Sequence, residues 1–291
     1  GCMTSETVKV AAVAMHSEMG DPEVNLKRLE HWAVKAHKEG AAFALFTEEC
    51  ITGSLNKSDL TVDQVHDIAR EAQELALPFL ERLSHELSMT VVVGTIEPVD
   101  GGLKNSAYIV GPEGHLTTFS KIHLPGGEND WFIPGDSVPV VSSQGWTFSV
   151  GICFDARFPE IFRAAARQGA DFFLLAVGAS GMPELVTSSG DQTEQAKAHK
   201  DLAMKYLPSR AVDNGLYVLK ANQSGKSGYG WFPGLALALD PDGDLIAEHM
   251  PDEGMIVVEV VREAIHKARS SLSCTVSEAR PAVYREPNIV R

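Results

Sequence analysis

The chain has 291 residues and a formal net charge of −14, from 25 basic and 39 acidic side chains. This charge argues against nucleic acid or an anionic membrane surface as a partner, because the sequence has no basic stripe that could displace counterions. Apolar residues make up 44% of the chain, which is enough for a substantial core. No apolar run reaches the roughly 18 residues of a membrane span, and no signal-peptide pattern precedes Val8.

The four cysteines, Cys2, Cys50, Cys153 and Cys274, form no C-x-x-C pair and no Cys/His spacing suited to zinc. We therefore expect no metal site. So few cysteines in a long chain are typical of a reducing compartment, and we expect a cytoplasmic protein.

The beginning of the chain has the pattern of a layered α/β fold. The almost wholly apolar stretch 8–15 predicts a buried strand. Asp21-Pro22 would then provide an N-cap and a first-turn proline for a helix that ends at Gly40. A second buried strand is predicted over 42–46, and the order strand, helix, strand is typical of this fold class.

Two acidic residues, Glu48 and Glu49, follow this second strand directly. The carboxyl ends of buried strands are where α/β sheets place chemistry. The same pattern fits two glutamates that are simply solvated beyond the strand, so both interpretations stay open at this point.

The next segment predicts a mixed sheet. Residues 65–88 have a helical pattern, in which Pro78 predicts either two helices or one kinked helix. A strand over 90–96 is followed by a hairpin whose strands cover 105–110 and 116–120. Because the two hairpin strands are antiparallel, the sheet is not purely parallel.

Lys121 stands at the end of the second hairpin strand, before a segment rich in glycine and proline that continues to Gly135. This segment has too many breakers for a regular element and is too apolar for an ordinary solvent loop. We therefore predict a packed active-site loop.

Cys153 lies where an apolar strand pattern over 146–152 meets a helix that is predicted to begin near Pro159. A side chain at such a junction is held on a rigid strand end, and the helix start favours a thiolate. The layout is that of a nucleophile elbow, although the G-x-S-x-G motif is absent. The alternative is a buried structural cysteine, which is the usual state of an isolated Cys.

The rest of the chain adds further elements without an internal repeat or a linker. The expected elements are a helix over 159–168, a strand over 171–177, a long connection over 178–192, a helical region to Asn214 interrupted by Pro208, strands over 216–221, 234–239, 245–248 and 255–260, and a last helix from Arg262. The tail from 270 to 291 has little periodicity, so it is either disordered or lies along a partner subunit. We interpret 1–291 as one domain, with a core over about 8–261 and a C-terminal helix and tail over 262–291.

Three reactive residue types thus stand at three separate strand ends, namely Glu48, Lys121 and Cys153. A carboxylate near a lysine can accept the proton of a thiol nucleophile. An ammonium and a backbone N–H can stabilise the oxyanion of a tetrahedral intermediate. His123 is the nearest histidine that could form a Cys–His pair, but we interpret it as structural or pocket-lining rather than as a base.

Four motifs resemble, in order and spacing, those of the nitrilase, or carbon–nitrogen hydrolase, superfamily. They are LFTEECITG, FSKIHLPGG, GICFDARFPEIFRAAARQGAD and SRAVDNGLYVLKANQSG, and the similarity covers about residues 8–261. The resemblance implies a four-layer α-β-β-α sandwich, that is, an α/β fold with mixed sheets. It also implies hydrolysis of a non-peptide C–N bond without metal or cofactor, and a homodimer formed through the helices that flank the cysteine motif.

The resemblance also implies roles for individual residues. Glu48 matches the general base, Lys121 the oxyanion-stabilising lysine and Cys153 the nucleophile. Glu128 matches a second glutamate that many amidase branches place near the lysine and the substrate. Further contacts with substrate or oxyanion are expected from four residues: Phe154 through its N–H, His123, Trp131 and Ala179. We expect the walls of the pocket to come from 178–192 and 129–132.

The chain departs from the family pattern at three places. Thr47 stands where a proline usually precedes the glutamate, and the acidic Glu49 stands where the family often has an apolar residue. The second difference bears on which of the two glutamates is the base, and Glu48 has the better register. The helix that leads to Arg210 has His199-Lys200-Asp201 in place of the common tryptophan, in a region that borders the substrate pocket of relatives.

The residues around Cys153 differ from the Cys-Trp-Glu of nitrile-specific members and resemble the amidase and carbamoylase branches. The segment 210–214 is similar to ω-amidase-like members, whereas 123–126 is similar to N-carbamoyl amino acid hydrolases. We expect an amidase that acts on a small aliphatic amide, with an N-carbamoyl amino acid or amine amidohydrolase as the alternative. A nitrilase and a non-catalytic scaffold subunit are the remaining hypotheses.

Overall fold

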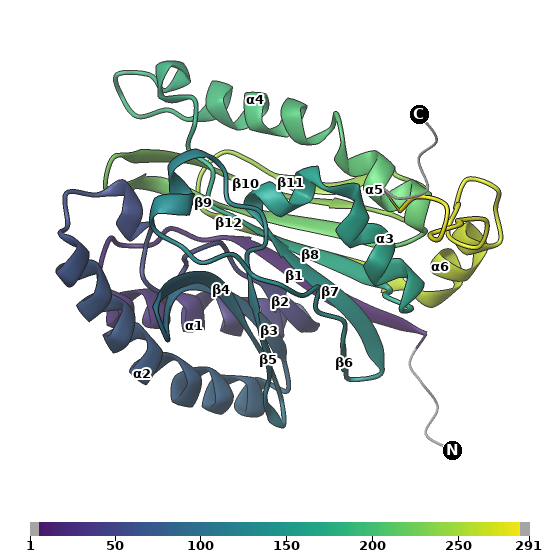
Figure 1. Cartoon of the computed structure of the whole chain (residues 1–291), viewed down its shortest axis with the longest axis horizontal. Coiled ribbons are helices and arrows are strands. Elements are labelled where there is room, and N and C mark those ends of the chain that lie inside the picture. Colours follow the sequence, from purple (N-terminus) through teal and green to yellow (C-terminus); the bar gives the residue numbers. More distant parts are fainter. Residues whose placement is uncertain (1–5, 286–291) are drawn as a thin grey trace.

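The computed structural model describes residues 6–285, and two six-stranded sheets form its centre (Figure 1). The first sheet has the strand order β12-β1-β2-β3-β4-β5 and the second has the order β11-β10-β9-β8-β7-β6. In each sheet three parallel strands, β1 to β3 and β7 to β9, are flanked by antiparallel neighbours. The prediction of mixed sheets is confirmed.

The strands cover the following residues. In the first sheet they are β1 (Thr7–Ala14), β2 (Ala41–Leu45), β3 (Thr90–Val99), β4 (Gly102–Gly111), β5 (Gly114–Ser120) and β12 (Gly254–Val261). In the second they are β6 (Val141–Ser143), β7 (Trp146–Ile152), β8 (Phe172–Val177), β9 (Tyr217–Ser227), β10 (Gly230–Leu239) and β11 (Leu245–His249).

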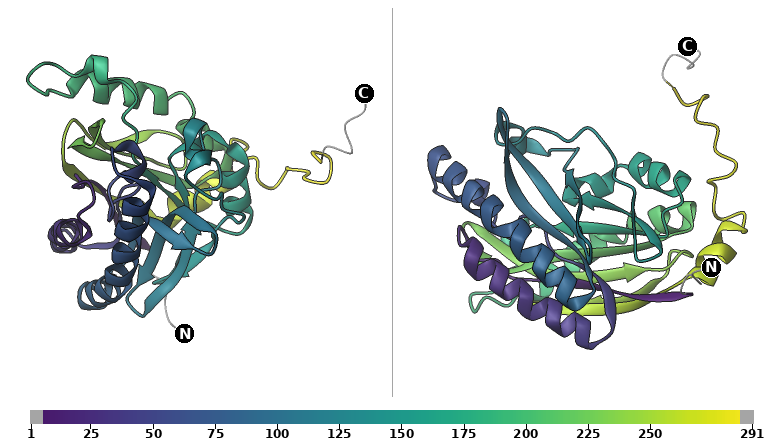
Figure 2. Two further views of the ribbon diagram at one scale, coloured as in Figure 1. Left: turned by 60° about the vertical axis from the view of Figure 1, so that its left-hand side comes forward. Right: turned by 90° about the horizontal axis from the view of Figure 1, so that it is seen from below.

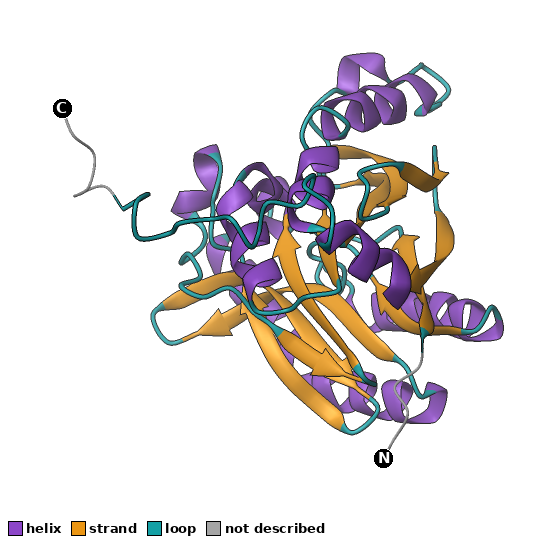
Figure 3. Cartoon of the chain, turned by 90° about the vertical axis from the view of Figure 1, so that its right-hand side faces the viewer, coloured by secondary structure: helices purple, strands orange, loops and turns teal. Residues whose placement is uncertain are grey.

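Helices lie outside both sheets, and Figure 3 colours them apart from the strands. They are α1 (Pro22–Lys38), α2 (Val62–Leu87), α3 (Pro159–Arg167), α4 (Thr193–Ala203), α5 (Leu207–Asn214) and α6 (Arg262–Arg269). The four short 3₁₀ turns of the described chain are η1 (Leu55–Lys57), η2 (Gly126–Asp130), η3 (Cys153–Arg157) and η4 (Pro183–Leu185).

The layers follow from which faces are apolar. Helices α1 and α2 lie side by side on the outer face of the first sheet (Figures 1 and 2) and bury residues such as Leu29 and Leu80 against it. Helices α3 and α5 cover the second sheet, with Phe162 stacked on Phe173. Between the sheets, the rings of Phe43, Phe148 and Phe172 pack against one another. The four-layer α-β-β-α sandwich that the resemblance implied is confirmed.

Helix α2 is a single helix that continues through Pro78. The sequence left two helices or one kinked helix open, because a proline removes one backbone hydrogen bond and its ring crowds the preceding turn. Two features support the helix across this position. Thr61 and Gln64 form a capping box at its start, and a face that includes Ala76 and Leu80 is buried against the first sheet.

Strands β9 and β10 are longer than predicted, since we expected 216–221 and 234–239. The added part of β9, up to Ser227, is polar, but it continues to pair with β10 from Gly230 onward. Ladder hydrogen bonds use the backbone, so they do not require the apolar pattern on which the prediction relied. The short strand β6 has no counterpart among the predicted elements. Pro208 lies in the first turn of α5, where a proline is tolerated, and so does not interrupt the interior of a helix.

The chain after α6 runs away from the sheets in the second view of Figure 2. Its first part is held by Arg163, whose guanidinium donates to both oxygens of Thr275, at 2.9 Å to the backbone and 2.7 Å to the side chain. The end of the predicted tail, 286–291, lies outside the described residues. Within 6–285, no helix combines the length and the apolar character that crossing a membrane requires.

Candidate active site

Strand ends from both sheets meet at one place. β2 leads to Glu48 and β5 leads to Lys121 in the first sheet, whereas β7 leads to Cys153 and β8 to Gly178 in the second. The parallel strands β2, β7 and β8 present their carboxyl ends here, which is the edge where α/β sheets hold reactive groups.

The buried carboxylate of Glu48 connects the two sheets. Its Oε2 accepts hydrogen bonds from Lys121 Nζ at 2.8 Å and from Asn105 Nδ2 at 2.7 Å. Its Oε1 accepts one from the backbone N–H of Gly178 at 2.9 Å. These three donors hold the carboxylate in one orientation.

Lys121 lies between two carboxylates. Its ammonium is also 2.8 Å from Glu128 Oε1, and the lysine side chain is fully buried. Burial alone would lower the pKa of Lys121, but the negative charges of Glu48 and Glu128 raise it above its usual value. Lys121 is therefore a permanent cation, suited to stabilising an oxyanion rather than to exchanging a proton.

The charges around Glu48 keep it ionised. Burial would raise the pKa of Glu48, but the positive charges of Lys121 and Lys57, with hydrogen bonds from Lys121 and Asn105, lower it below its ordinary value. By contrast, burial and the neighbouring Glu48 raise the pKa of Glu128, although Lys121 opposes this. Glu48 is therefore ionised and can act as a base. Glu128, whose pKa is raised, is protonated more readily than Glu48.

Cys153 occupies a constrained turn at the end of β7. Its backbone has a φ of 47°, in the left-handed region that most residues avoid. The buried carboxylate of Asp155 braces this turn by accepting the N–H of Ile152 at 3.0 Å. Burial and the charge of Glu48 raise the pKa of Cys153 to about 12, although Lys121 and Lys57 lower it. The resting nucleophile is thus a thiol beside a carboxylate base.

Glu49 has a different environment from its neighbour Glu48. It is buried, its φ is 54°, and its Oε2 has no hydrogen-bond partner among the described residues. Burial and the charge of Glu48 raise the pKa of Glu49 to about 8. Only Glu48 of the two bonds to Lys121, so the geometry favours Glu48 over Glu49 as the base, as its register in the motif does.

His123 serves the loop rather than the thiol. Its Nδ1 lies 2.8 Å from Asp155 Oδ1, which also accepts the backbone N–H of His123 at 3.0 Å. The imidazole stacks on Phe158 with ring centroids 3.5 Å apart. His123 therefore ties the lysine loop to the cysteine turn, which is a structural role.

A cavity of about 140 Å³ opens beside Cys153. Its lining residues are Cys153, Phe154, Ala156, Arg157, Val177, Ala179, His199, Leu202, Tyr206 and Lys220. Of the four residues expected near the substrate, Phe154 and Ala179 line this cavity, and His123 and Trp131 do not. Trp131 packs against an apolar cluster formed by residues such as Leu55 and Phe132.

The walls of this cavity differ from the expected ones. We expected segments 178–192 and 129–132, but only Ala179 of these lines it. Helix α4, the turn after it and strand β9 form the other side, through His199, Leu202, Tyr206 and Lys220. The positions of these elements depend on long-range packing, which local sequence patterns do not report.

Sequence reasoning missed three residues that position the site. Asn105 donates a hydrogen bond to Glu48, and the charge of Lys57 lowers the pKa of Glu48. Asp155 braces the cysteine turn. Lys57 also donates to the carbonyl of Gly178 at 3.1 Å. A signal existed for Asn105, because an amide at the start of an otherwise apolar strand needs a buried partner. No local signal marked Lys57.

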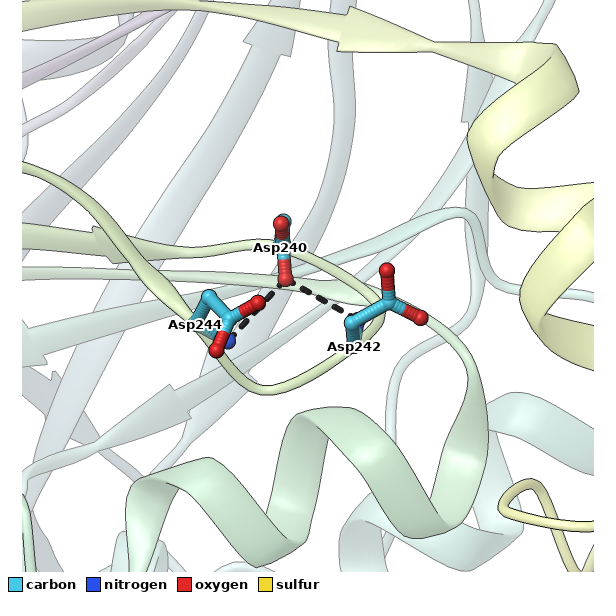
Figure 4. A group of neighbouring side chains, drawn as sticks. All are labelled: Asp240, Asp242 and Asp244. Atoms are coloured by element: carbon cyan, nitrogen blue, oxygen red, sulfur yellow. Dashed lines mark hydrogen bonds between the residues drawn. The ribbon is translucent and has the colours of Figure 1, made fainter.

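A group of acidic residues elsewhere in the described chain forms a turn. Asp240, Asp242 and Asp244 gather between β10 and β11 (Figure 4). Asp240 Oδ1 accepts the backbone N–H groups of Asp242 and Asp244, each at 3.0 Å. These bonds stabilise the turn of the β10–β11 hairpin, which explains why the three aspartates lie together.

Comparison with known proteins agrees with this geometry. The family model described as carbon-nitrogen hydrolase matches residues 9–270. The chain belongs to this family. The assignment to the nitrilase superfamily that the four motifs suggested is confirmed, and so is the expectation of a hydrolase acting on carbon–nitrogen bonds.

Several relatives of this carbon–nitrogen hydrolase are similar over most of their length. A nitrilase from Pyrococcus abyssi is 30% identical over 242 residues, covering 82% of this chain and 84% of that protein. An omega-amidase from Saccharomyces cerevisiae is 27% identical over 98% of this chain and 97% of its own length. An (R)-stereoselective amidase from Pseudomonas sp. is 27% identical over 90% and 88%.

Solved structures share the fold. An amidase from Nesterenkonia sp. superposes with a TM-score of 0.74 at 24% identity, covering 93% of this chain and 97% of that one. In another structure of a Nesterenkonia amidase, with a TM-score of 0.73 at 24% identity, covering 90% and 97%, acrylamide has added to the active-site cysteine.

Proposed function

We propose that this enzyme is an amidase that hydrolyses a small aliphatic amide to a carboxylic acid and ammonia through a thioester on Cys153. The observation that carries the proposal is the cluster of buried Glu48 and Lys121 with the partly buried Glu128, next to a cavity lined by Cys153. The cluster contains a base and a fixed cation, which are the groups that acyl transfer to a thiol needs.

Acylation starts from the thiol form of Cys153. Glu48 takes the Sγ proton as the sulfur attacks the amide carbonyl, and the electron pair of the C=O bond moves to oxygen. Lys121 and the Phe154 N–H stabilise this oxyanion. The protonated Glu48 then gives its proton to the leaving nitrogen, the C–N bond breaks, and ammonia departs.

Deacylation uses the same groups. Glu48, again ionised, takes a proton from water while the water oxygen attacks the thioester carbonyl. The C–S bond breaks, the sulfur regains the proton from Glu48, and the acid leaves. We assign to Glu128 the orientation of Lys121, because their 2.8 Å contact fixes the ammonium between two carboxylates.

The alternative proposal is an N-carbamoyl amino acid or amine amidohydrolase. The carbonyl carbon of an N-carbamoyl substrate also bears a nitrogen leaving group, so its hydrolysis needs the same catalytic groups. A panel of small amides, ω-amides, N-carbamoyl amino acids and nitriles distinguishes the classes by ammonia release. We expect turnover of amides, and turnover of nitriles alone would contradict both proposals.

Intact mass after brief exposure to the amides tests the thioester. We expect an acyl adduct on the full-length enzyme that disappears in Cys153→Ala. A non-catalytic scaffold protein would acquire no adduct, and Cys153 would then be alkylated by iodoacetamide no faster than Cys50 and Cys274.

We also propose that the enzyme works as a cytoplasmic homodimer. The three described cysteines are free thiols, as a reducing compartment would keep them. A groove of about 610 Å³ on α3 and α5, lined by residues that include Pro159, Arg163 and Tyr284, offers an apolar surface away from Cys153. Tyr284 is 66% exposed in the single chain, which supports a partner subunit at this place.

A further inference from the structure

A group of buried polar atoms without a hydrogen-bond partner lies in segments near Glu48. Among residues 6–285 these atoms include Glu49 Oε2, Ser54 Oγ, Asn56 Oδ1, Asn105 Oδ1, Gln223 Oε1 and Nε2, and Ser227 Oγ. Asn105 donates to Glu48 through Nδ2, so its unpaired Oδ1 lies beside the base. None of these residues lines the Cys153 cavity. Folded proteins leave few buried polar atoms unpaired, so such a group requires a physical explanation.

The segments that carry these atoms pack against one another. Residues 49–56 follow β2, and Ser227 belongs to the β9–β10 hairpin. The N–H of Tyr229 in this hairpin donates to the carbonyl of Lys57 at 3.0 Å. At Gly228 a Cβ would lie only 2.6 Å from the same carbonyl oxygen, which shows how closely the hairpin approaches the segment after β2.

Gln223 lies on the face of β9 that turns to the first sheet. Ala221, two positions earlier on the same face, belongs to the core between the sheets. The Lys57 ammonium donates to the carbonyl of Gly178, which follows β8, at 3.1 Å and lies 5.5 Å from the ring centre of Phe232 on β10. Since β8 and β10 are the two neighbours of β9, Lys57 lies over the second half of β9. It belongs to the segment after β2 of the first sheet, so it approaches β9 from the face that carries Gln223.

The unpaired atoms include both donors and acceptors. The Gln223 amide has one of each, the oxygens of Asn56 and Asn105 accept, and the serine hydroxyls can do both. Burial and the charge of Glu48 raise the pKa of Glu49 to about 8, so its carboxyl group is protonated at neutral pH and can also donate. A bound ion would suit only part of this set, whereas water suits all of it, because water both donates and accepts.

We infer that these side chains bind internal water between the two sheets, and that this water reaches Glu48 and hydrolyses the thioester. The inference rests on the proposed amidase function, because it assigns the source of the water that deacylation consumes. The acyl group on Cys153 would occupy the cavity of about 140 Å³, and water from between the sheets does not have to pass it. Glu48 takes one proton of this water as the water oxygen bonds to the acyl carbon, and the sulfur receives that proton when the C–S bond breaks. Gln223 is thus a positioning residue that acts through the water.

The test lets water compete with hydroxylamine for the thioester formed from butanamide. Water releases butanoic acid, whereas hydroxylamine attacks the same carbon and releases the hydroxamic acid, so the product ratio compares two steps that both follow acylation. Gln223→Met keeps the length of the side chain and removes both polar atoms. In the full-length enzyme it should raise the hydroxamate-to-acid ratio by about 10-fold, because the water loses its position. The rate of hydroxamate formation should stay within about 3-fold, since hydroxylamine enters from solvent through the cavity.

Two variants serve as controls. Gln223→Asn keeps the amide and leaves space for water, so its product ratio should be closer to that of the wild type than the ratio of Gln223→Met. Tyr108→Phe removes another buried hydroxyl that has no partner in the described part of the chain, but this one packs under α2 on the outer face of the first sheet. It should leave the ratio unchanged. Melting temperatures show whether each variant is folded.

A crystal structure that resolves ordered water separates this inference from the proposed function. We expect water within hydrogen-bond distance of the Gln223 amide and of Glu49 Oε2 in the wild type, and its loss around position 223 in Gln223→Met. If these atoms bind no water, or if Gln223→Met leaves the product ratio unchanged, the inference is refuted while the amidase function stands. If no amide is turned over, the proposed function fails and the delivery of water fails with it, and the crystal structure then decides whether the water site exists.

Discussion

Glu48 and Glu49 are adjacent in the chain and have opposite protonation environments. Hydrogen bonds and the charge of Lys121 hold Glu48 ionised, whereas Glu49 is buried beside it and forms no ion pair with a cation of the described chain. Two ionised carboxylates so close would repel each other, and Glu49, whose Oε2 has no hydrogen-bond partner among the described residues, therefore keeps its proton. The difference comes from surroundings, since the two side chains are chemically identical.

Replacement of the base should separate catalysis from loop structure. Glu48→Gln keeps the shape of the side chain but cannot accept the thiol proton, so we expect kcat to fall by at least about 10³-fold. His123→Asn removes the stack on Phe158 and should change kcat by less than about 10-fold. Steady-state kinetics on a hydrolysed amide measures both, and equal losses would mean that His123 takes part in proton transfer.

Glu49 should make the stability of the enzyme depend on pH. Its folded-state pKa of about 8 lies above the value of 4.5 expected in the unfolded chain. Between these values the folded state binds the proton that the unfolded state has lost, so the free energy of unfolding falls as pH rises from about 4.5 to about 8. The slope from one such group is at most about 1.4 kcal/mol per pH unit.

Glu49→Gln tests this dependence, because the amide does not titrate. Melting temperatures measured across that pH interval should decline more steeply for the wild type than for the variant. The difference should be largest near the upper end. Parallel curves for the two proteins would show that Glu49 ionises normally in the fold.

The reactivity of Cys153 should also depend on pH. Because its pKa is raised to about 12, the thiolate fraction grows about tenfold for each pH unit below that value. We therefore expect the rate of alkylation by iodoacetamide, followed by intact mass, to increase steadily up to the highest pH at which the enzyme stays folded. A plateau near neutral pH would indicate a preformed thiolate instead.

At the scale of elements, the site depends on how closely strands approach the segment that carries Glu48. Gly94 of β3 lies against this segment, where a Cβ would be 2.6 Å from the Glu49 nitrogen and 2.9 Å from Glu48 Cα, with the Thr47 carbonyl oxygen closer still. All of these neighbours are backbone or Cα atoms, so they cannot move aside as a flexible side chain would. The glycine is therefore required for the position of the base.

Gly94→Ala should push Glu48 away from Lys121. We expect kcat to fall by on the order of 100-fold, with a lower melting temperature, because misplacement of a catalytic group by about 1 Å has this effect. Gly181→Ala is the matched control, since a Cβ there meets no atom within 4 Å and the residue does not need a positive φ. Normal activity of Gly94→Ala would show that β3 can shift without moving the base.

At the scale of the whole molecule, the groove on α3 and α5 links the fold to assembly. Its lining includes Ala279, Pro281 and Tyr284 from the tail. The preceding residues are anchored, since Cys274 is buried and the N–H of Thr275 donates to the carbonyl of Asp213 at 2.9 Å. A deletion that begins after Thr275 therefore removes the tail residues that line the groove. It leaves the part of the tail that Cys274 and Thr275 attach to the rest of the molecule.

A chain that ends at Glu278 should lose the proposed homodimer. Sedimentation velocity of the full-length protein should give a dimer and the shortened protein a monomer or a weaker dimer. The melting temperature serves as the control for folding. An unchanged dimer would place the interface elsewhere, and a monomeric full-length protein would refute the dimer itself.

The sequence predicted the order of strands and helices, the mixed sheets and the reactive residues at strand ends. These features depend on apolar periodicity and on glycine and proline, which influence the chain over only a few residues. The positions of Lys121 and Cys153 at strand ends followed from such patterns. Polar strand segments such as the second half of β9 were not predictable, because backbone pairing leaves no hydrophobic pattern. Pro78 was ambiguous, since packing against the first sheet decides whether its helix continues.

The sequence by itself determined the family, the chemistry and the three residues Glu48, Lys121 and Cys153 as candidates. Only the tertiary structure decided which glutamate contacts the lysine, which side chains wall the cavity, and that the side chain of Gln223 has no hydrogen-bond partner among the described residues. These properties depend on distances between segments far apart in the chain. Charge, burial and hydrogen bonding are set by those distances, so the protonation states that catalysis uses arise only when both sheets come together.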